Sequence, residues 1–138
     1  YFMPGMAASS QIFEKIKLPE NQFECYYLEW VIPDFGETLD QYAQRMATKV
    51  EHDNAVLIGV SFGGILVQEM KKYLNLYKVI IISSVKTNEE LPTKMKLAKA
   101  TKIYKALPTS LLSNFDTFAK FAFGNMIKTR IDLYKKYL

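Results

Sequence analysis

An α/β fold built on a parallel sheet is what this sequence predicts, and three observations predict it. Two short apolar runs, AVLIGV at 55–60 and KVIIISS at 78–84, are typical of strands buried on both faces. Segments with apolar residues at helical spacing alternate with such runs. Alternation of this kind places parallel strands side by side and helices on both faces of the sheet. We therefore expect a three-layer αβα core over residues 1–87.

The first elements are short. Residues 1–3 end a strand, and Ser9 or Ser10 caps a short helix that continues to about Lys17. The aromatic run FECYYLEW at 23–30 indicates a second strand.

The following elements carry clearer signals. After a loop at 33–36, Thr38 is the predicted N-cap of an amphipathic helix over 39–50, with apolar residues at helical spacing. The strand at 55–60 leads into a helix that begins near Gly63 and ends before Asn75. The strand at 78–84 closes the series, so the order is β, α, β, α, β, α, β.

Residues 88–138 differ in character from residues 1–87. They show no strand pattern, they are broken at Pro92 and Pro108, and most of the lysines lie there. We expect a helical cap segment placed after a parallel strand. Its aromatic and apolar residues are typical of a packed helical core, and where part of the block faces Ser61 they would instead give the cap an apolar inner face suited to a medium or long apolar chain. They include Tyr104, Phe115, Phe118, Phe121, Phe123 and Met126.

Residues 59–63 read GVSFG and match the pattern G-x-S-x-G. The pattern is informative only between a buried strand and a helix, and both are predicted here. A turn this tight holds Ser61 in a strained backbone conformation. Gly59 and Gly63 leave room where the strand and the helix close on each other, and Gly64 lets the first helical turn approach its neighbours. The hydroxyl is thereby presented as a candidate nucleophile.

The start of the predicted helix offers amide donors for an oxyanion. Backbone N–H groups are unpaired at a helix N-terminus, and the helix dipole is positive there. The Phe62 N–H is one candidate donor. The Met6 N–H is the second, since Pro4-Gly5-Met6 follows the first strand and Gly5 allows a tight turn.

These residues resemble the α/β-hydrolase family. The resemblance rests on the GVSFG elbow after a buried strand, on Pro4-Gly5-Met6 after an earlier strand, and on VIIISS after the elbow helix. The family's oxyanion loop usually begins HG, and here Pro4 stands in place of that histidine. The loop at 33–36 lies where the family often carries a D-x-x-G turn. The resemblance covers residues 1–87 and implies a serine hydrolase that cleaves an ester or related acyl bond, carboxylesterase-like or lipase-like.

The sequence departs from the family in its acid and base. The family order is Ser, then Asp or Glu, then His. The single histidine, His52, precedes Ser61 and is separated from it by a strand, or roughly 20 Å. We expect His52 to be a surface residue at a helix end. The general base is therefore expected beyond residue 138, and the chain as given is expected to be inactive. Weaker acid candidates are Glu89 and Glu90, whereas Asp116 and Asp132 are expected to face solvent.

Composition excludes several other classes of function. The single cysteine, Cys25, rules out an internal disulfide, fits a reducing, cytoplasmic compartment, and is expected to be a buried thiol. One cysteine and one histidine cannot supply a metal-ligand cluster, so neither a metal nor a cofactor is expected. No nucleic-acid motif and no apolar run of about 18 residues occurs.

Two other functions stay open. The first is a non-catalytic protein of the same fold that binds a ligand or partner in the pocket. The second is a nucleotide-binding protein in which GVSFGG is a chance match, although neither G-x-G-x-x-G nor G-x-x-x-x-G-K-[ST] occurs. Both ends suggest a fragment of a longer chain. We expect the exposed sheet edge of such a fragment to favour homo-oligomers or aggregation.

Overall fold

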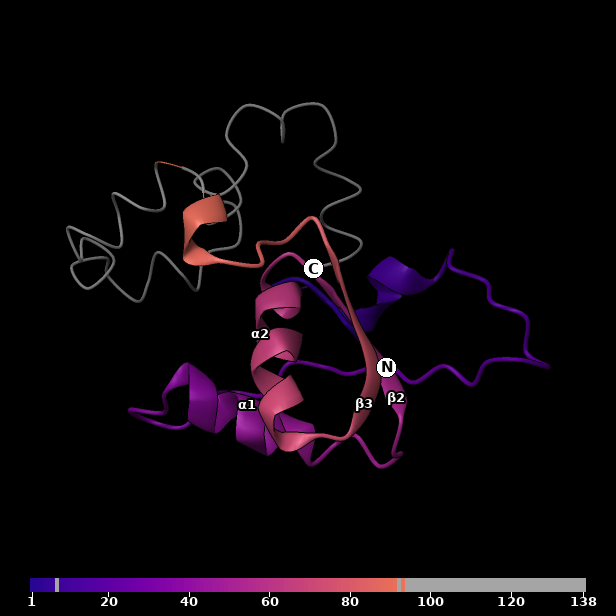
Figure 1. Ribbon diagram of the computed structural model, residues 1–138, viewed down its shortest axis with the longest axis horizontal. Helices are drawn as coiled ribbons and strands as arrows, with labels where there is room; N and C mark the ends of the chain where they lie inside the picture. The colour runs from indigo at the N-terminus through magenta and orange to yellow at the C-terminus, as the bar shows by residue number, and fades with distance from the viewer. Residues whose placement is uncertain (7, 92, 94–138) are drawn as a thin grey trace. The chain divides into compact units, whose positions relative to one another are not determined.

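Three parallel strands form the sheet in the computed structural model, which describes residues 1–6, 8–91 and 93 (Figure 1). They are β1 (Phe2–Met3), β2 (Ala55–Val60) and β3 (Leu76–Ile82), in the order β1-β2-β3. The predicted α/β class and the parallel sheet are confirmed. All three strands belong to a compact unit that spans Tyr1–Lys86, whereas Thr87–Leu91 and Thr93 belong to a second unit.

The register of the sheet aligns the carboxyl ends of its strands. Met3 pairs with Gly59, and Val60 pairs with Ile82. Strand β3 begins and ends two residues earlier than the sequence predicts, since Leu76 already pairs with Ala55 across a bulge. The strands therefore finish together where the Pro4 loop, the Ser61 turn and the segment after Ile82 begin.

The predicted strand over 23–30 is reduced to one bridge. Phe2 pairs with Tyr27 in parallel, through the bonds Phe2 N–H to Tyr26 O (2.8 Å) and Leu28 N–H to Phe2 O (2.9 Å). The neighbouring strand β1 is only two residues long, so it offers little backbone to pair with. The bridge still shows where this segment lies, which is on the side of β1 opposite β2.

Within Tyr1–Lys86 the structure has two α-helices, α1 (Leu39–Ala47) and α2 (Phe62–Met70). Helix α1 begins with a complete capping box, in which Thr38 Oγ1 accepts from the Gln41 N–H and the Gln41 side chain accepts from the Thr38 N–H. A cap of this type stabilises a helix by about 1 kcal/mol. Helix α2 tightens into the 3₁₀ turn η2 (Lys71–Tyr73). The prediction of both helices is confirmed.

The predicted helix from Ser9 to Lys17 is wrong in type and length. The structure has a 3₁₀ turn, η1 (Ser10–Phe13), and the Ser9 side chain makes no capping hydrogen bond. Phe13 is the only buried residue of the turn. Without an apolar face at helical spacing, a longer helix would have nothing to pack against.

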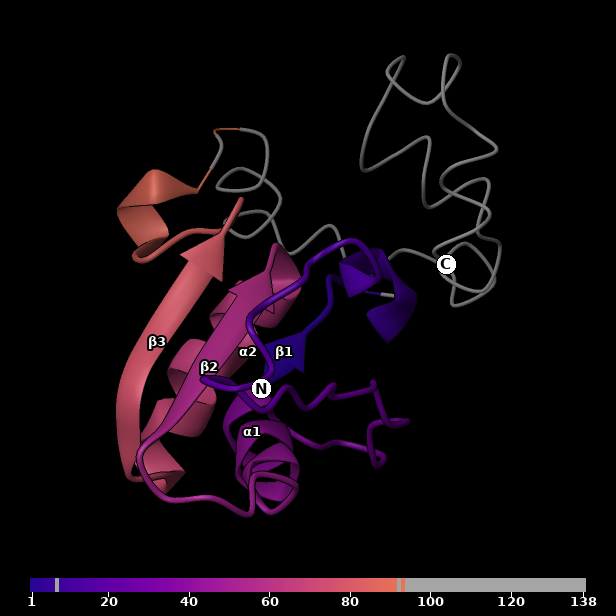
Figure 2. The ribbon, with the colours of Figure 1, turned by 90° about the vertical axis from the view of Figure 1, so that its right-hand side faces the viewer.

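The two faces of the sheet are covered unequally, as Figures 1 and 2 show. Both α-helices lie on one face, where Met3, Leu57, Met46, Leu66 and Met70 form a fully buried core.

On the other face, η1 brings Phe13 to within 5.1 Å of the Phe2 ring centroid. Ile80 and Ile82 there stay 38% and 41% exposed. The expectation that β3 is buried on both faces, between two helical layers, is therefore wrong for the described residues.

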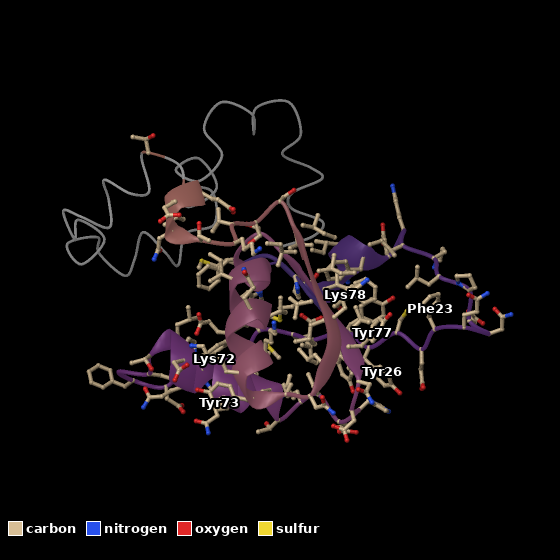
Figure 3. All side chains as sticks on the ribbon, viewed as in Figure 1. Phe23, Tyr26, Lys72, Tyr73, Tyr77 and Lys78 are labelled. Atoms are coloured by element: carbon tan, nitrogen blue, oxygen red, sulfur yellow. The ribbon has the colours of Figure 1, made fainter. Side chains whose placement is uncertain are left out.

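Residues on either side of the sheet illustrate this difference in Figure 3. Lys72 and Tyr73 reach from the end of α2 to the Asp40 carboxylate on α1, at 3.0 and 2.8 Å. Tyr77, by contrast, is 73% exposed. Helix packing and polar contacts thus join α1 to α2 on the covered face.

Most of the predicted cap segment lies outside the described residues. This includes the helices expected after Pro92, the aromatic inner face from Tyr104 to Met126, and both Asp116 and Asp132. Within the part that is described, Asn88–Glu90 form a 3₁₀ turn, η3, in the second unit.

Candidate active site

Ser61 stands at the junction of β2 and α2 in a strained backbone conformation. Its φ is 53° and its ψ is −120°, and its side chain makes no capping hydrogen bond. Two backbone bonds hold it there, from the Ser61 N–H to Ile82 O (2.9 Å) and from the Gly64 N–H to Ser61 O (3.0 Å). A non-glycine residue in such a conformation costs about 1–3 kcal/mol. Ser61 is also solvent-exposed.

Glycine is required on both sides of Ser61 by the closeness of the backbones. A Cβ on Gly59 would lie 2.7 Å from the Gly64 Cα, and a Cβ on Gly63 would lie 2.7 Å from the Met3 carbonyl oxygen. Backbone atoms cannot move aside as the end of a side chain can. The strand and the helix therefore approach each other, and the end of β1, only because both positions lack a side chain. Gly64 is similar, since a Cβ there would meet the Ser84 side chain.

The loop after β1 lies against the elbow. A Cβ built on Gly5 would be 3.5 Å from the Ser61 Cβ, which is an ordinary van der Waals distance. Gly5 accepts a bond from the Ala8 N–H (3.0 Å), so a turn does begin there. Gly5 does not have a positive φ, however, so the turn does not require glycine at this position. Met6, whose N–H is the second predicted donor, is an exposed residue of the same loop.

The strand order gives a second reason to place a site here. β1 lies between the Tyr27 segment and β2, so the chain leaves β1 for one side of the sheet and then crosses to the other. The first connection runs through η1 on one face, and the next two run through α1 and α2 on the opposite face (Figure 1). In open α/β sheets ligands bind beyond the carboxyl ends of the strands at such a switch point. The loop at Pro4 and the turn at Ser61 occupy this place.

Trp30 is a site residue that the sequence pattern did not single out. Its indole N–H donates to the Gly5 carbonyl oxygen at 2.7 Å, and its ring stacks on Phe62 with centroids 5.8 Å apart. It is the only tryptophan in the sequence. A half-buried indole N–H needs an acceptor. That requirement is the one feature of the sequence that could have pointed to Trp30. The acceptor itself could not be found without the fold.

Beside the elbow, Ser84 Oγ is buried and has no hydrogen-bond partner among the described residues. The segment that contains it is held to α2 by Gln68, whose side-chain amide donates to Gly64 O and Val85 O, both at 2.9 Å. Ser83 also has a positive φ, 48°. This second strained turn abuts the first helical turn of α2 through Gly64.

His52 lies at the amino end of β2, away from Ser61. It is exposed, and its ring nitrogens contact Tyr1 Oη at 2.7 Å and Tyr26 Oη at 3.4 Å. The strand β2 runs between the two residues. The expectation that His52 is a surface residue outside reach of Ser61 is confirmed, but α1 already ends at Ala47, so His52 does not lie at a helix end.

The remaining candidates are Glu89, Glu90 and Cys25. Glu89 and Glu90 belong to η3 in the second unit, and both have an interaction partner. Cys25 is half-buried, so the expectation of a fully buried thiol is wrong. A groove of about 610 Å³ is lined by Tyr1, Tyr26 and Glu51 among others, and none of its lining residues belongs to the elbow.

The shifted pKa values mark structural contacts. A hydrogen bond from Arg45 lowers the pKa of the Glu37 carboxyl, and hydrogen bonds from Tyr73 and Lys72 lower that of Asp40. Arg45 and Asp40 both lie on α1, so these hydrogen bonds connect α1 to Glu37 and to the turn that contains Lys72 and Tyr73. Within residues 1–6, 8–91 and 93, no cluster of three or more His, Cys, Asp and Glu could hold a metal ion. Over the same residues, no helix is long and apolar enough to cross a membrane.

The fold and the site together define a mixed α/β protein with a serine at a strained strand-to-helix turn beyond the carboxyl ends of a parallel sheet. Comparison with known proteins adds no family, since no family model matches the chain and no curated protein is significantly similar to it.

Proposed function

We propose that this chain carries the nucleophile and the oxyanion donors of an α/β-hydrolase that cleaves an ester or related acyl bond. The observation that supports the proposal most strongly is the backbone of Ser61. A serine is held at φ 53°, exposed, between a strand and a helix that can meet only through Gly59 and Gly63. Strain of 1–3 kcal/mol at an exposed polar residue is typical of functional sites.

The chemistry follows from the atoms at the turn. Ser61 Oγ gives its proton to a base and attacks the acyl carbon, a C–O bond forms, and the carbonyl π electrons move onto the carbonyl oxygen. The Phe62 N–H, at the start of α2, and the Met6 N–H donate to that oxyanion. Collapse expels the leaving oxygen with a proton and leaves an acyl ester on Ser61, which water then hydrolyses.

A proton acceptor is the part that these 138 residues do not supply. The hydroxyl of a serine is a weak nucleophile near neutral pH without an adjacent base. The single histidine lies at the opposite end of β2. We infer that a histidine outside this sequence acts as the base in the active protein, and that this chain alone acylates slowly. The aromatic composition of residues 88–138 supports a substrate with an apolar acyl chain.

A non-catalytic role is the second candidate, and the same missing base favours it. In that case the turn and the loop at Pro4 would bind the oxygen of a ligand or partner without chemistry. Chemical rescue distinguishes the two roles.

The test uses the chain as it stands. It is incubated with a fluorophosphonate probe, with and without added imidazole, and the labelled serine is located by mass spectrometry. Imidazole supplies the general base, so labelling at Ser61 should rise with imidazole concentration, whereas Ser83 and Ser84 should stay unlabelled. S61A should remove all the labelling.

Two results would contradict the proposal. One is labelling spread over several serines at the rate of a free serine peptide, with no dependence on folding. The other is a Ser61 rate, without imidazole, equal to that of an extended chain that contains a histidine base. The latter would refute the inference that the base is missing.

A further inference from the structure

One side chain, Trp30, contacts both backbone segments that carry the predicted oxyanion donors. Its indole N–H donates to the carbonyl oxygen of Gly5 at 2.7 Å, and Gly5 shares a peptide unit with the Met6 N–H. Its ring stacks on Phe62 at 5.8 Å with an interplanar angle of 26°. Phe62 carries the other donor.

The bond to Gly5 determines which way the Met6 N–H points. The described peptide bonds are all trans. The C=O and the N–H of one trans peptide point in opposite directions within a plane. The Gly5 oxygen accepts from Trp30 and also from the Ala8 N–H at 3.0 Å, so two bonds hold the plane. Fixing the carbonyl therefore fixes the amide hydrogen on the other side.

The indole makes a second ring contact. The ring of Tyr42, on α1, stacks on Trp30 with centroids 6.1 Å apart. The Tyr42 hydroxyl donates to Val31 O at 2.8 Å and accepts from the Val31 N–H at 3.1 Å. Three stacked rings thus connect helix α1 to the first residue of α2 through Trp30. An indole with two ring contacts and a hydrogen bond cannot rotate freely.

We propose that Trp30 is the positioning residue of the oxyanion-binding site, which sets the orientation of the Met6 N–H relative to the Phe62 N–H. This inference rests on the proposed function. It predicts that removal of the indole N–H slows acylation of Ser61 without unfolding the chain. A misplacement of about 1 Å can slow a reaction by about 100-fold, so we expect at least a tenfold loss.

The experiment exploits the single tryptophan of the sequence. Biosynthetic replacement of tryptophan by 3-benzothienylalanine changes only position 30, keeps the bicyclic ring and exchanges the N–H for sulfur. W30F is the genetic counterpart. The matched control is Y77F, which also loses a donor and keeps a ring, at a residue that is 73% exposed on β3.

Two measurements are made on each protein: the imidazole-assisted labelling rate of Ser61 and the position of the Met6 amide signal in NMR spectra of methionine-labelled chain. Circular dichroism verifies that each protein is folded. With the analogue we expect the labelling rate to fall at least tenfold and the Met6 amide signal to move. Y77F should change neither.

The two measurements separate failure of this inference from failure of the proposed function. An unmoved Met6 signal overturns the inference whatever the labelling rate. An unchanged labelling rate with a moved signal also overturns it, because the orientation would then have no effect on acylation. If the unmodified chain shows no selective labelling, the proposed function fails and the Met6 signal alone decides whether Trp30 orients the loop.

Discussion

The two ends of the sheet in this molecule are built in opposite ways. At the carboxyl end, backbone meets backbone: Gly63 lies against Met3, and Ser61 is held at positive φ by main-chain bonds. At the amino end, side chains meet: Tyr1 and Tyr26 stack at 4.8 Å and contact His52. The carboxyl end offers the Ser61 hydroxyl but not the histidine that would act as its base. The amino end holds the only imidazole of the sequence, out of reach of that hydroxyl.

Positive φ occurs at both ends of β2, and the residue types differ. Asn54, just before the strand, has φ 55°, and Ser61, just after it, has φ 53°. Asparagine is several-fold enriched at positive φ, whereas serine is not. At the amino end the strain is small because asparagine tolerates positive φ. At the carboxyl end Ser61 therefore retains backbone strain that Asn54 largely avoids.

The largest effect should come from G63A. The added Cβ would lie 2.7 Å from the Met3 carbonyl oxygen, so the start of α2 must move away from β1. Overpacking of this kind costs about 1–3 kcal/mol and occasionally more, and we expect about 3 kcal/mol in urea unfolding. G5A is the matched control, since its Cβ would make an ordinary contact at 3.5 Å. Equal losses in the two variants would contradict a close-packed elbow.

Relief of the strain at Ser61 should give the next largest effect. S61G removes the Cβ at φ 53°, and we expect it to be more stable than the unmodified chain by about 1–2 kcal/mol in the same unfolding assay. N54G should gain less over the unmodified chain, because asparagine already tolerates positive φ. Gains of the same size at both positions would remove the distinction between the two ends of the strand.

Acid should weaken the loop that follows Trp30. Arg45 Nε donates to Glu37 Oε1 at 2.9 Å and lowers the pKa of that carboxyl. A lowered pKa in the folded state means stabilisation that is present above the unfolded pKa and is lost as pH falls through the folded one. We expect the melting temperature to drop below about pH 4.3, near the unfolded Glu value. In E37Q the drop in melting temperature should be smaller. An acid profile identical to that of the unmodified chain would show that Glu37 does not cause the drop.

The smallest effect is expected from H52F at the amino end. His52 is exposed and lies at the far end of β2, so the imidazole-assisted labelling rate of Ser61 should stay within about twofold of the unmodified chain. The variant should lose little stability, because exposed side-chain hydrogen bonds contribute about 1 kcal/mol or less. A tenfold loss of labelling would identify His52 as the base and would overturn the contrast between the two ends.

Much of the carboxyl end was predictable because its signals are local. The small residues around Ser61 predict a tight turn wherever a strand meets a helix, and the strained φ confirms it. The Thr38 cap was predictable for the same reason, since donor and acceptor lie three residues apart. The segment at 23–30 shows the opposite case. Its aromatic composition favours a strand, yet pairing depends on how much of β1 is available beside it.

The sequence by itself determined the parallel α/β class, the elbow glycines and the absence of a histidine after Ser61, because each follows from neighbouring residues or from composition. Only the tertiary structure decided that both α-helices share one face, that β1 lies at a switch point, and that Trp30 bonds to Gly5. These features join residues that are distant in sequence, such as Trp30 and Gly5, 25 positions apart, and their geometry depends on strand order. No local pattern specifies that order.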